Sequence, residues 1–337
     1  MTTRYRVIGN NGSPYSMKLR AIMRYRRLPF DWVYRLPDVR EQLAGKIKVG
    51  LIPVLHIPDE DRYLIDSTPI AYALERRHGE RSILPPNPGL AFLCHLIEDM
   101  ADEWLTKAMF LYRWEKPEDQ EYSARWIIAD SRPDLSGTAF EDAVAAIRDR
   151  QVGRMPLVGC TPQNATVIKE SYWRIMDALN AHIRIDRYLF GSRPGLADFG
   201  LFGQLKTLAT DHTPMLEMRA RAVYVEHWVR QVDDLSGLEG DWIASAADLP
   251  DATRDLLTLA GEVYLPFLQA NAAAAKDGLR SFETQLLGKP YAQAPFGYQV
   301  KCLGWLQEEF QALPADDRAA IKPVLRQTGC WDVLATT

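Results

Sequence analysis

The chain has 337 residues, enough for about two domains, and its 47% hydrophobic and 25% charged residues are ordinary for a soluble globular protein. The formal net charge of −4 excludes a general attraction to nucleic acid or to anionic membranes. No apolar segment is long enough for a signal peptide or a membrane span. We therefore expect a cytoplasmic protein that has neither a nucleic acid nor a membrane as partner.

The first 80 residues or so alternate between strand and helix patterns. The predicted strands cover 5–8, 31–35, 52–57 and 63–65, and the predicted helices cover about 14–27 and 67–78. A polar connection joins the second strand to the third, and the turn 58–61 joins the last two strands. This order predicts a small α/β domain over residues 1–82, with the first two strands parallel and the last two in a hairpin.

A segment rich in Pro and Gly, residues 82–89, separates this domain from a longer helical part. Helical periodicity is predicted at about 90–114, 119–130, 138–150, 163–188, 196–210, 215–231, 252–276, 278–287, 297–313 and 315–328. We therefore expect a second, all-α domain over residues 90–337, with a C-terminal extension from about 232.

Neither cysteine nor histidine spacing indicates a metal site. The four cysteines, Cys94, Cys160, Cys302 and Cys330, form no CxxC pair, and the six histidines form no HExxH motif or ligand cluster. The thiols are expected to be reduced and structural.

Ser13 lies at the end of the first strand and the start of the first helix, followed by Pro14. Ser is a favoured helix N-cap and Pro a favoured first helical residue, so the helix is predicted to begin here. A hydroxyl at this place lies beside unpaired backbone N–H groups and the positive end of the helix dipole. It is either a plain cap or a binding position for an anion such as a thiolate.

Two further features follow in the first domain. Pro53 stands at the entrance of an apolar strand, and if the Ile52–Pro53 bond is cis, the Ile52 backbone can pair with an extended peptide. Asp66 and Ser67 lie between a strand and a helix. They either cap that helix or hold the ammonium and carboxylate of a ligand.

The order and spacing of these features resemble the glutathione S-transferase family. Residues 13–20 resemble the active-site helix start of its serine-type classes, 52–55 its cis-proline strand, and 66–70 its Glu/Asp-Ser glutathione clamp. Residues 190–199 are similar to its buried N-capping box. The resemblance runs from residue 4 to about 231 and leaves out the last hundred residues or so.

One departure from the family pattern concerns that capping box. The family usually has Ser or Thr at the cap position, which here is Gly195. Because glycine has no side-chain oxygen, only Asp198 can complete half of the box.

The resemblance implies a thioredoxin-like domain followed by a large all-helical domain, and glutathione as co-substrate without a metal. It implies that Ser13 donates a hydrogen bond to the glutathione thiolate. The backbone of Ile52, before Pro53, would pair with the cysteinyl part of the tripeptide, and Asp66 and Ser67 would take its γ-glutamyl end.

Other candidates remain open beside these residues. Lys46 or Lys48 could reach the glycyl carboxylate, and Tyr5, Tyr15 or Ser16 could replace Ser13 as donor. The pocket for the second substrate is expected from 98–104 and from the side chains Met109, Phe110, Tyr112, Arg113 and Trp114. The tail segment 291–298 is expected either to cover this pocket or to bury an extra layer of helices.

The expected activity is attack of the glutathione thiolate on a small hydrophobic electrophile in a cleft between the domains. The outcome could be conjugation, isomerisation, a lyase reaction or dehalogenation, and the family resemblance implies a homodimer. The alternative is a non-catalytic protein that binds glutathione or a hydrophobic ligand on the same fold. Thiol–disulfide reduction would need a reactive Cys94, whose place in an apolar helical pattern argues against it.

Overall fold

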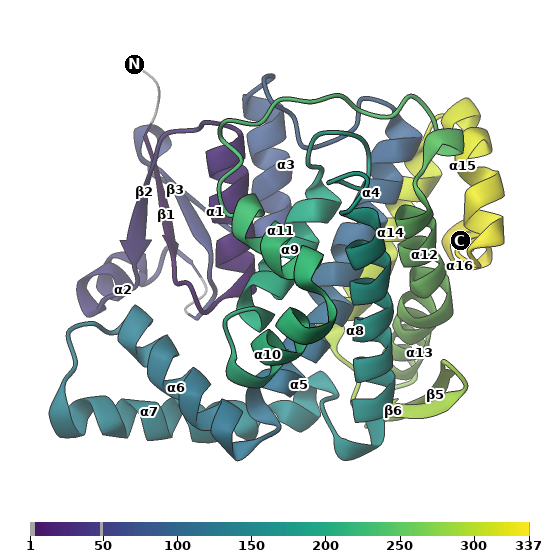
Figure 1. The fold of residues 1–337 in the computed structure, drawn as a ribbon. Coiled ribbons are helices and arrows are strands. Elements are labelled where there is room, and N and C mark those ends of the chain that lie inside the picture. Colours follow the sequence, from purple (N-terminus) through teal and green to yellow (C-terminus); the bar gives the residue numbers. More distant parts are fainter. Residues whose placement is uncertain (1–3, 48–49, 337) are drawn as a thin grey trace.

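A four-stranded sheet forms the centre of the N-terminal part in the computed structural model, which describes residues 4–47 and 50–336 (Figure 1). Its strands are β1 (Tyr5–Gly9), β2 (Phe30–Tyr34), β3 (Val54–Ile57) and β4 (Arg62–Ile65), in the spatial order β2-β1-β3-β4. β1 and β2 run parallel, and β3 is antiparallel to both β1 and β4. The predicted strand directions are confirmed.

Helices cover both faces of this sheet. α1 (Pro14–Tyr25) and α3 (Ser67–Arg77) pack on one face, where Val7 joins a buried cluster with Leu19 and Ile70. The short α2 (Pro37–Leu43) covers the other face, where Ile8 packs with Val39 and Leu43. Because side chains alternate along a strand, the consecutive residues Val7 and Ile8 serve opposite layers.

The rest of the chain is mostly helical (Figure 1). Most of it lies on the far side of α1 and α3 from the sheet, while the helices of residues 117–152 lie below the sheet in this view. Its α-helices up to residue 232 are α4 (Pro88–Met100), α5 (Thr106–Trp114), α6 (Pro117–Ser131), α7 (Gly137–Val152), α8 (Pro162–His182), α9 (Leu196–Leu208), α10 (His212–Arg221) and α11 (Val223–Val232). A π-helical turn, Ala101–Leu105, joins α4 to α5, and the 3-10 helix Met155–Val158 follows α7.

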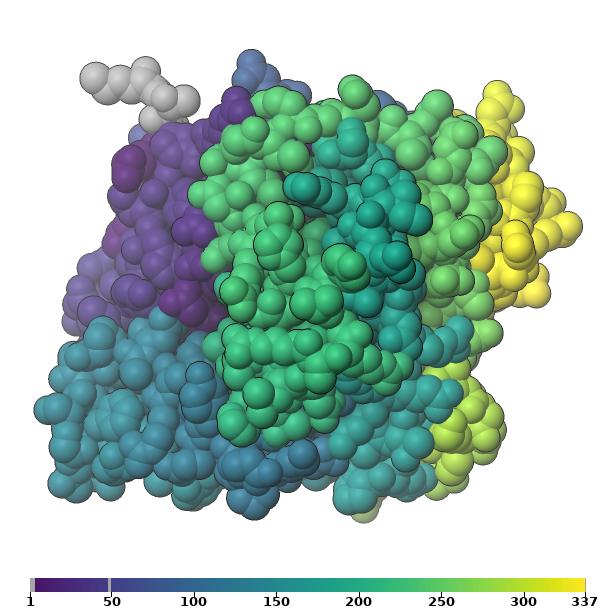
Figure 2. All heavy atoms as spheres, viewed as in Figure 1, coloured from purple at the N-terminus to yellow at the C-terminus, as the bar shows by residue number. Residues whose placement is uncertain are grey.

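The extension after residue 232 adds a further layer. It contains α12 (Asp251–Leu259), α13 (Leu265–Lys276), β5 (Phe282–Leu286), β6 (Lys289–Gln293), α14 (Gly297–Ala312), α15 (Ala315–Gln327) and α16 (Trp331–Ala335). α12, α14 and α15 all pack against α4, and α12 also packs against α8. In the space-filling view this yellow-green layer lies on the opposite side of the molecule from the purple N-terminal domain (Figure 2).

The fold class is a thioredoxin-like α/β domain followed by a large helical part, as the sequence predicts. The proposed division at residues 82 and 90 stays a prediction, because the main hydrophobic core continues across it. Met17, Ala21 and Tyr25 of α1 belong to the same buried cluster as α4, α8 and α9.

The prediction that residues 90–337 are all-α is wrong at one place. Residues 278–287 were expected to be helical, but Phe282–Leu286 form β5, paired with β6 in an antiparallel hairpin. The two-residue turn Leu287-Gly288 has φ values of 52° and 68°, the left-handed pair typical of a tight hairpin turn. Along β5, Phe282 and Leu286 are buried while Glu283 is exposed. This alternation of buried and exposed side chains is typical of a strand and not of a helix.

The polar connection after β2 was also interpreted wrongly, since it contains α2. Pro37 at the first turn and Asp38 beside it favour a helix start. With only Val39 and Leu43 buried, the segment is too short to give a clear helical period.

Two glycines of α9 allow neighbouring helices to approach closely. A Cβ atom on Gly203 would lie 2.6 Å from the Pro14 carbonyl oxygen, and one on Gly200 would lie 3.0 Å from the Glu98 side chain. The start of α1 and the end of α4 are therefore both held against α9 at backbone distance.

We predict that Gly203→Ala destabilises the protein by about 1–3 kcal/mol, because the backbone of Pro14 cannot yield as a side chain would. The matched control is Gly304→Ala on α14, where nothing lies within 4 Å of the new Cβ. That change should stabilise the helix by about 0.5–1 kcal/mol. Urea unfolding of both variants measures the difference, and equal midpoints would contradict the packing argument.

Candidate active site

Ser13 caps the amino end of α1, as predicted from Ser13-Pro14. Its backbone is extended, with φ −100° and ψ 117°, and its Oγ accepts a hydrogen bond of 3.2 Å from the Ser16 N–H. The side chain is 9% exposed, and its hydroxyl proton has no acceptor among the described residues. The Ser13 hydroxyl therefore has one hydrogen bond left to donate, beside the positive end of a helix dipole.

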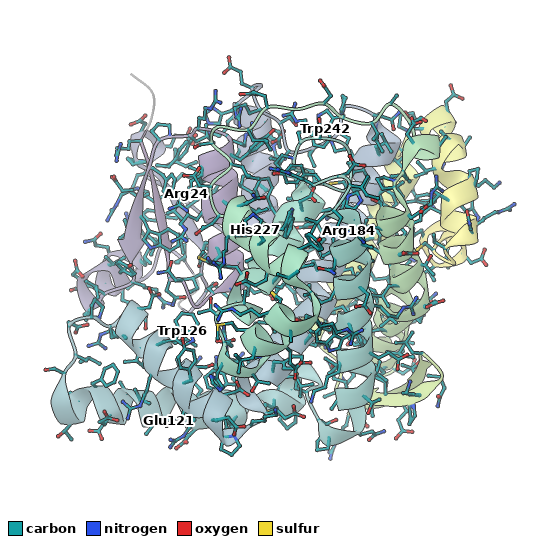
Figure 3. The ribbon with its side chains drawn as sticks, in the orientation of Figure 1. Arg24, Glu121, Trp126, Arg184, His227 and Trp242 are labelled. Carbon is teal, nitrogen blue, oxygen red and sulfur yellow. The ribbon has the colours of Figure 1, made fainter. Side chains whose placement is uncertain are left out.

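The helical part of the chain holds the loop that precedes Ser13. The Asn11 N–H donates to Asp130 of α6 at 2.7 Å, and Arg113 of α5 donates to the Gly12 carbonyl at 2.9 Å. Arg113 is itself fixed by a 2.7 Å ion pair with the buried Asp211. Asp211 also accepts from Trp126 of α6, labelled in Figure 3. The position of Ser13 thus depends on α5 and α6 as well as on α1.

Ser13 lines a cavity of about 480 Å³ between the N-terminal domain and the helical part. Ile52 lines the same cavity, and the peptide bond between Ile52 and Pro53 is cis. Among the described residues, the Ile52 backbone forms no hydrogen bond. The structure therefore brings together two of the predicted site residues, Ser13 and Ile52.

Three further predicted residues, Pro53, Asp66 and Ser67, are not among those that line this cavity. The Asp66 carboxylate accepts a hydrogen bond from Tyr298 of α14, and Ser67 Oγ accepts from Lys18 at 3.4 Å. Asp66 has a φ of 73°, a strained value for a non-glycine residue that is typical of functional turns. Its role in binding stays a prediction, and its side chain already has a partner from the C-terminal extension.

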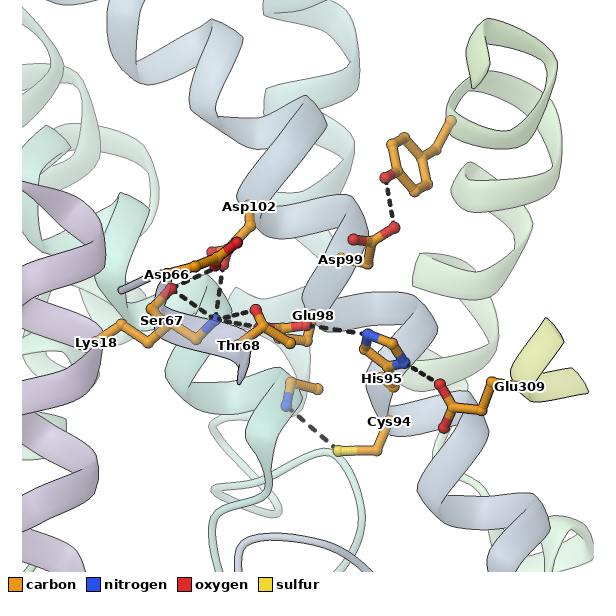
Figure 4. A network of polar contacts seen from close by, with 12 residues as sticks. Lys18, Asp66, Ser67, Thr68, Cys94, His95, Glu98, Asp99, Asp102 and Glu309 are labelled. Atoms are coloured by element: carbon orange, nitrogen blue, oxygen red, sulfur yellow. Dashed lines mark hydrogen bonds and ion pairs between the residues drawn. The ribbon is translucent and has the colours of Figure 1, made fainter. Parts of the chain in front are cut away.

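A buried ionic cluster lies directly behind this turn (Figure 4). Lys18 Nζ donates to Asp102 Oδ2 at 2.6 Å and to Thr68 Oγ1 at 3.1 Å, and it forms an ion pair with Glu98. The side chains of Lys18 and Glu98 are 0% exposed. The cluster therefore ties α1 and α3 of the first domain to α4 and the π-helical turn of the second.

In this cluster the Lys18 cation contacts two carboxylates, Glu98 and Asp102, and these charges shift the pKa values of Lys18 and Asp102. Burial works against the charged lysine, but Asp102 and Glu98 outweigh it and raise the pKa of Lys18. Burial raises the pKa of Asp102 to about 7, with Lys18 opposing and Glu98 adding to the rise. Lys18 is thus charged at neutral pH.

Two of the three alternative donors, Tyr5 and Tyr15, form hydrogen bonds elsewhere. Tyr5 OH lies 2.8 Å from His78 Nε2, and Tyr15 OH donates to the Asp102 carbonyl at 3.0 Å. Burial, followed by the charges of Glu103 and Asp102, raises the pKa of Tyr15. Ser16 Oγ is buried without a partner against the backbone of Gly9. Of these three residues only Tyr15 lines the cavity with Ser13.

Lys48 lies outside the described residues, and Lys46 has partners of its own. Lys46 Nζ lies 3.0 Å from Asp61 and donates to Tyr63 at 3.4 Å. Lys46 is not among the residues that line the cavity.

The predicted second-substrate wall is found in part. From the segment 98–114 the cavity is lined by Glu103, Thr106, Lys107, Met109, Phe110, Arg113 and Trp114. Tyr112 does not line it, because its hydroxyl donates to Glu217 instead. Phe296 and Tyr298 of the tail also line the cavity, so the extension both adds a layer of helices and covers the pocket.

The sequence interpretation missed several lining or supporting residues. Lys18 lies four residues before Ile22 on the apolar side of α1, so its spacing could have indicated a buried charge. Arg150 and Arg154, at the end of α7, line the cavity but gave no pattern distinct from a solvated helix end. Their position beside the cavity depends on the packing of α7 against α5.

Cysteine and metal chemistry find no support in the described residues. All four cysteines are free and buried, and burial raises the pKa of the Cys94 thiol. Within residues 4–47 and 50–336, no group of His, Cys, Asp and Glu could hold a metal ion. No helix in the same ranges is long and apolar enough to cross a membrane.

Comparison with protein-family models gives one match, which lies in the first domain. Residues 7–82 match the model described as glutathione S-transferase, N-terminal domain. The match covers the sheet, α1 to α3 and both predicted binding turns, and it ends before α4. The similarity is limited to the N-terminal domain and does not extend to the helical remainder.

Solved structures give weaker similarities, and no curated protein sequence matches the chain. A glutathione S-transferase from Methylobacterium radiotolerans JCM 2831, in complex with glutathione sulfonate, is 19% identical over 74% of this chain and 100% of its own, with a TM-score of 0.44. A beta-etherase from Sphingobium sp. strain SYK-6 is 17% identical over 69% of this chain and 95% of its own, with a TM-score of 0.48. Similarity this low says nothing about the chemistry of this chain.

The contact between His95 of α4 and Glu309 of α14 generates a pH prediction. Burial favours the neutral imidazole, but the Glu309 carboxylate outweighs it and raises the pKa of His95 to about 9. The raised folded-state pKa contributes stability below about pH 6.5, and this contribution is lost as the pH rises toward 9. Glu309→Gln should lower stability at pH 6 by about 1–2 kcal/mol and by less at pH 9.

Denaturant unfolding of both proteins across this pH range measures the effect. The difference between them isolates the contact, because other titrating groups act on both. A difference that does not change with pH would show that His95 is not charged in the folded protein.

Proposed function

We propose that this chain is a glutathione-dependent transferase in which Ser13 stabilises the thiolate of glutathione. The observation that carries the proposal is the free hydroxyl proton of Ser13 at the amino end of α1. It lines a cavity with Ile52, inside a domain that matches the glutathione S-transferase N-terminal model. Ser13 would donate to the sulfur and would not itself attack the second substrate.

The required stabilisation is within reach of these groups. A free thiol has a pKa near 8.5, and lowering it by about two units needs roughly 2.7 kcal/mol in favour of the anion. A hydrogen bond to a charged group contributes about 1.5–3 kcal/mol, and a helix amino end adds about 0.3–1 kcal/mol. The amino end of α1 with Ser13 therefore suffices without a metal.

The rest of the tripeptide would bind beside the end of the sheet at which Ile52 leads into β3. The unpaired backbone of Ile52 suits the cysteinyl part, since an extended peptide pairs with exposed N–H and C=O groups. The γ-glutamyl carboxylate suits the amino end of α3, which begins at Ser67. Its ammonium group would need Asp66, and so would compete with Tyr298.

The second substrate in this proposal is a small hydrophobic electrophile. The apolar part of the cavity lining includes Phe110, Trp114, Ile127, Ile147 and Phe296. This lining fits any reaction in which the thiolate attacks an apolar molecule, whether conjugation, isomerisation, a lyase step or dehalogenation. A role in detoxification, a cytoplasmic location and a homodimer belong to the same proposal.

A second candidate is a non-catalytic protein that binds glutathione or a hydrophobic ligand. Two observations favour this candidate. Tyr298 donates a hydrogen bond to Asp66, and Ser67 forms hydrogen bonds with Lys18 and Asp102. Both residues that were expected to hold the γ-glutamyl end therefore already have partners within the chain. In that case the apolar cavity would hold its ligand without a reactive thiolate.

Ser13→Ala is predicted to reduce glutathione conjugation of an aryl halide by about 10- to 100-fold, because the hydrogen bond to the thiolate, about 1.5–3 kcal/mol, is lost while the helix end remains. Glutathione binding should change little. The pKa of the bound thiol, followed by ultraviolet absorbance of the thiolate, should rise toward 8.5.

Ser13→Thr is the matched control, because it keeps both the hydroxyl and a favoured N-cap. It should retain most of the activity. If Ser13→Ala and the wild type show the same thiol pKa, Ser13 is not the donor. If wild-type protein conjugates no electrophile but binds apolar ligands tightly, the second candidate replaces the first.

Tyr298→Phe tests whether Asp66 receives the ammonium group of glutathione. It removes the hydroxyl from Asp66 but leaves the ring against Trp305, with a centroid distance of 5.9 Å. If Asp66 receives the glutathione ammonium, glutathione should bind about fivefold more tightly, since one competing hydrogen bond is lost. Calorimetric titration measures the change.

Tyr264→Phe provides the comparison for that titration. Tyr264 also donates to a carboxylate, Asp99, at 2.6 Å, but it does not line the cavity. Its loss should leave glutathione affinity unchanged. Equal affinity in the wild type and Tyr298→Phe would exclude Asp66 as the ammonium site.

A further inference from the structure

The cavity beside Ser13 carries an excess of positive charge. Its charged lining residues are the acid Glu103 and the bases Lys107, Arg113, Arg150 and Arg154. The whole chain has a net charge of −4, so this excess is local to the cavity. The charges are distributed unevenly enough to favour one class of ligand.

Three of these five charged groups already have hydrogen-bond or ion-pair partners within the protein. Arg113 pairs with Asp211, and Lys107 donates to the Val158 carbonyl at 2.9 Å and to Gln293 at 2.8 Å. Glu103 accepts from Gln299, and burial, followed by the charges of Asp99 and Asp102, raises its pKa. Glu103 therefore offers little negative charge to a cation in the cavity.

Arg150 and Arg154 differ from the other arginines of this region. Arg148 of α7 pairs with Glu121 of α6, which Figure 3 labels, and with Asp149 at 3.2 Å. Arg125 pairs with Glu141 at 2.7 Å. In the described part of the chain, neither the Arg150 nor the Arg154 guanidinium has a hydrogen bond or ion pair, although acids lie along the same helices.

These two guanidinium groups adjoin an apolar surface. Ile147, one turn before Arg150, lines the cavity with Ile127 and Trp114. Leu157, three residues after Arg154, also lines the cavity and is 57% exposed. Phe296 from the tail lines it as well and is 48% exposed. Large exposed apolar side chains beside unpaired cations fit a ligand that has an aromatic body and an anionic end.

We propose that the second substrate is an aromatic electrophile bearing a carboxylate or a similar anionic group, and that Arg150 and Arg154 hold this anion at the mouth of the cavity. The proposal rests on the proposed function for its reactive step. With an aryl chloride, the glutathione sulfur forms a bond to the ring carbon. The carbon–chlorine bond breaks, chloride leaves with the electron pair, and the thiol proton has already gone to solvent.

The experiment compares a chloronitrobenzoate with its uncharged amide, the chloronitrobenzamide. Wild-type protein should turn over the benzoate with a kcat/KM about tenfold above that of the amide, after correction for their uncatalysed rates with glutathione. The double variant Arg150→Gln with Arg154→Gln should lose this preference through a raised KM for the benzoate. Its rate with the amide should not change.

Arg148→Gln is the matched control, because it removes the same charge from the same helix without lining the cavity. It should keep the tenfold preference. Unfolding midpoints of all variants show that each is folded. Equal kcat/KM for both compounds in the wild type, or a preference that survives in the double variant, would overturn the proposal.

A binding measurement separates this inference from the proposed function. Nitrobenzoate and nitrobenzamide have no leaving group, so calorimetric titration reports their affinity without any reaction. Tighter nitrobenzoate binding that depends on Arg150 and Arg154 supports the anion site even if no electrophile is turned over. Turnover lost in Ser13→Ala, with no benzoate preference in any assay, supports the transferase and refutes the anion site.

Discussion

The placement of one buried lysine between two carboxylates is the constraint on which the junction of the molecule depends. Lys18 reaches from α1 into a region where Glu98 and Asp102 are buried, and Thr68 and Ser67 of α3 complete its surroundings (Figure 4). A charge taken out of water is tolerated only when it is paired, and removing one partner of such a pair costs about 3–5 kcal/mol. The cluster therefore fixes how the two parts of the chain meet.

The candidate site follows from this junction. Asp102 belongs to the same helical segment as Glu103 and Thr106, which line the cavity, and Lys18 lies one turn after Pro14 on α1. When the cluster holds α1 against α4 and α9, the amino end of α1 points to a cavity walled by α5, α7 and the tail. The surroundings of Ser13 therefore depend on the charged cluster around Lys18, which does not contact Ser13.

The N-terminal domain could be predicted in some detail because its signals are local. Ser13-Pro14 specifies a helix start, and the turn Asp66-Ser67 lies where a strand pattern gives way to a helical one. The hairpin at 282–293 was missed for the opposite reason. Its first strand has a weak alternation over only five residues, and its turn places Leu287, a residue without turn preference, at positive φ.

The sequence by itself determined the thioredoxin-like first domain with its four strands and the cap at Ser13, because capping, turn chemistry and periodicity act over a few residues. Only the tertiary structure decided that Tyr298 contacts Asp66, that Lys18 is buried, and that Arg150 and Arg154 adjoin the Ser13 cavity. These contacts join residues far apart in the chain. Their partners are chosen by the packing of whole helices, which no short pattern encodes.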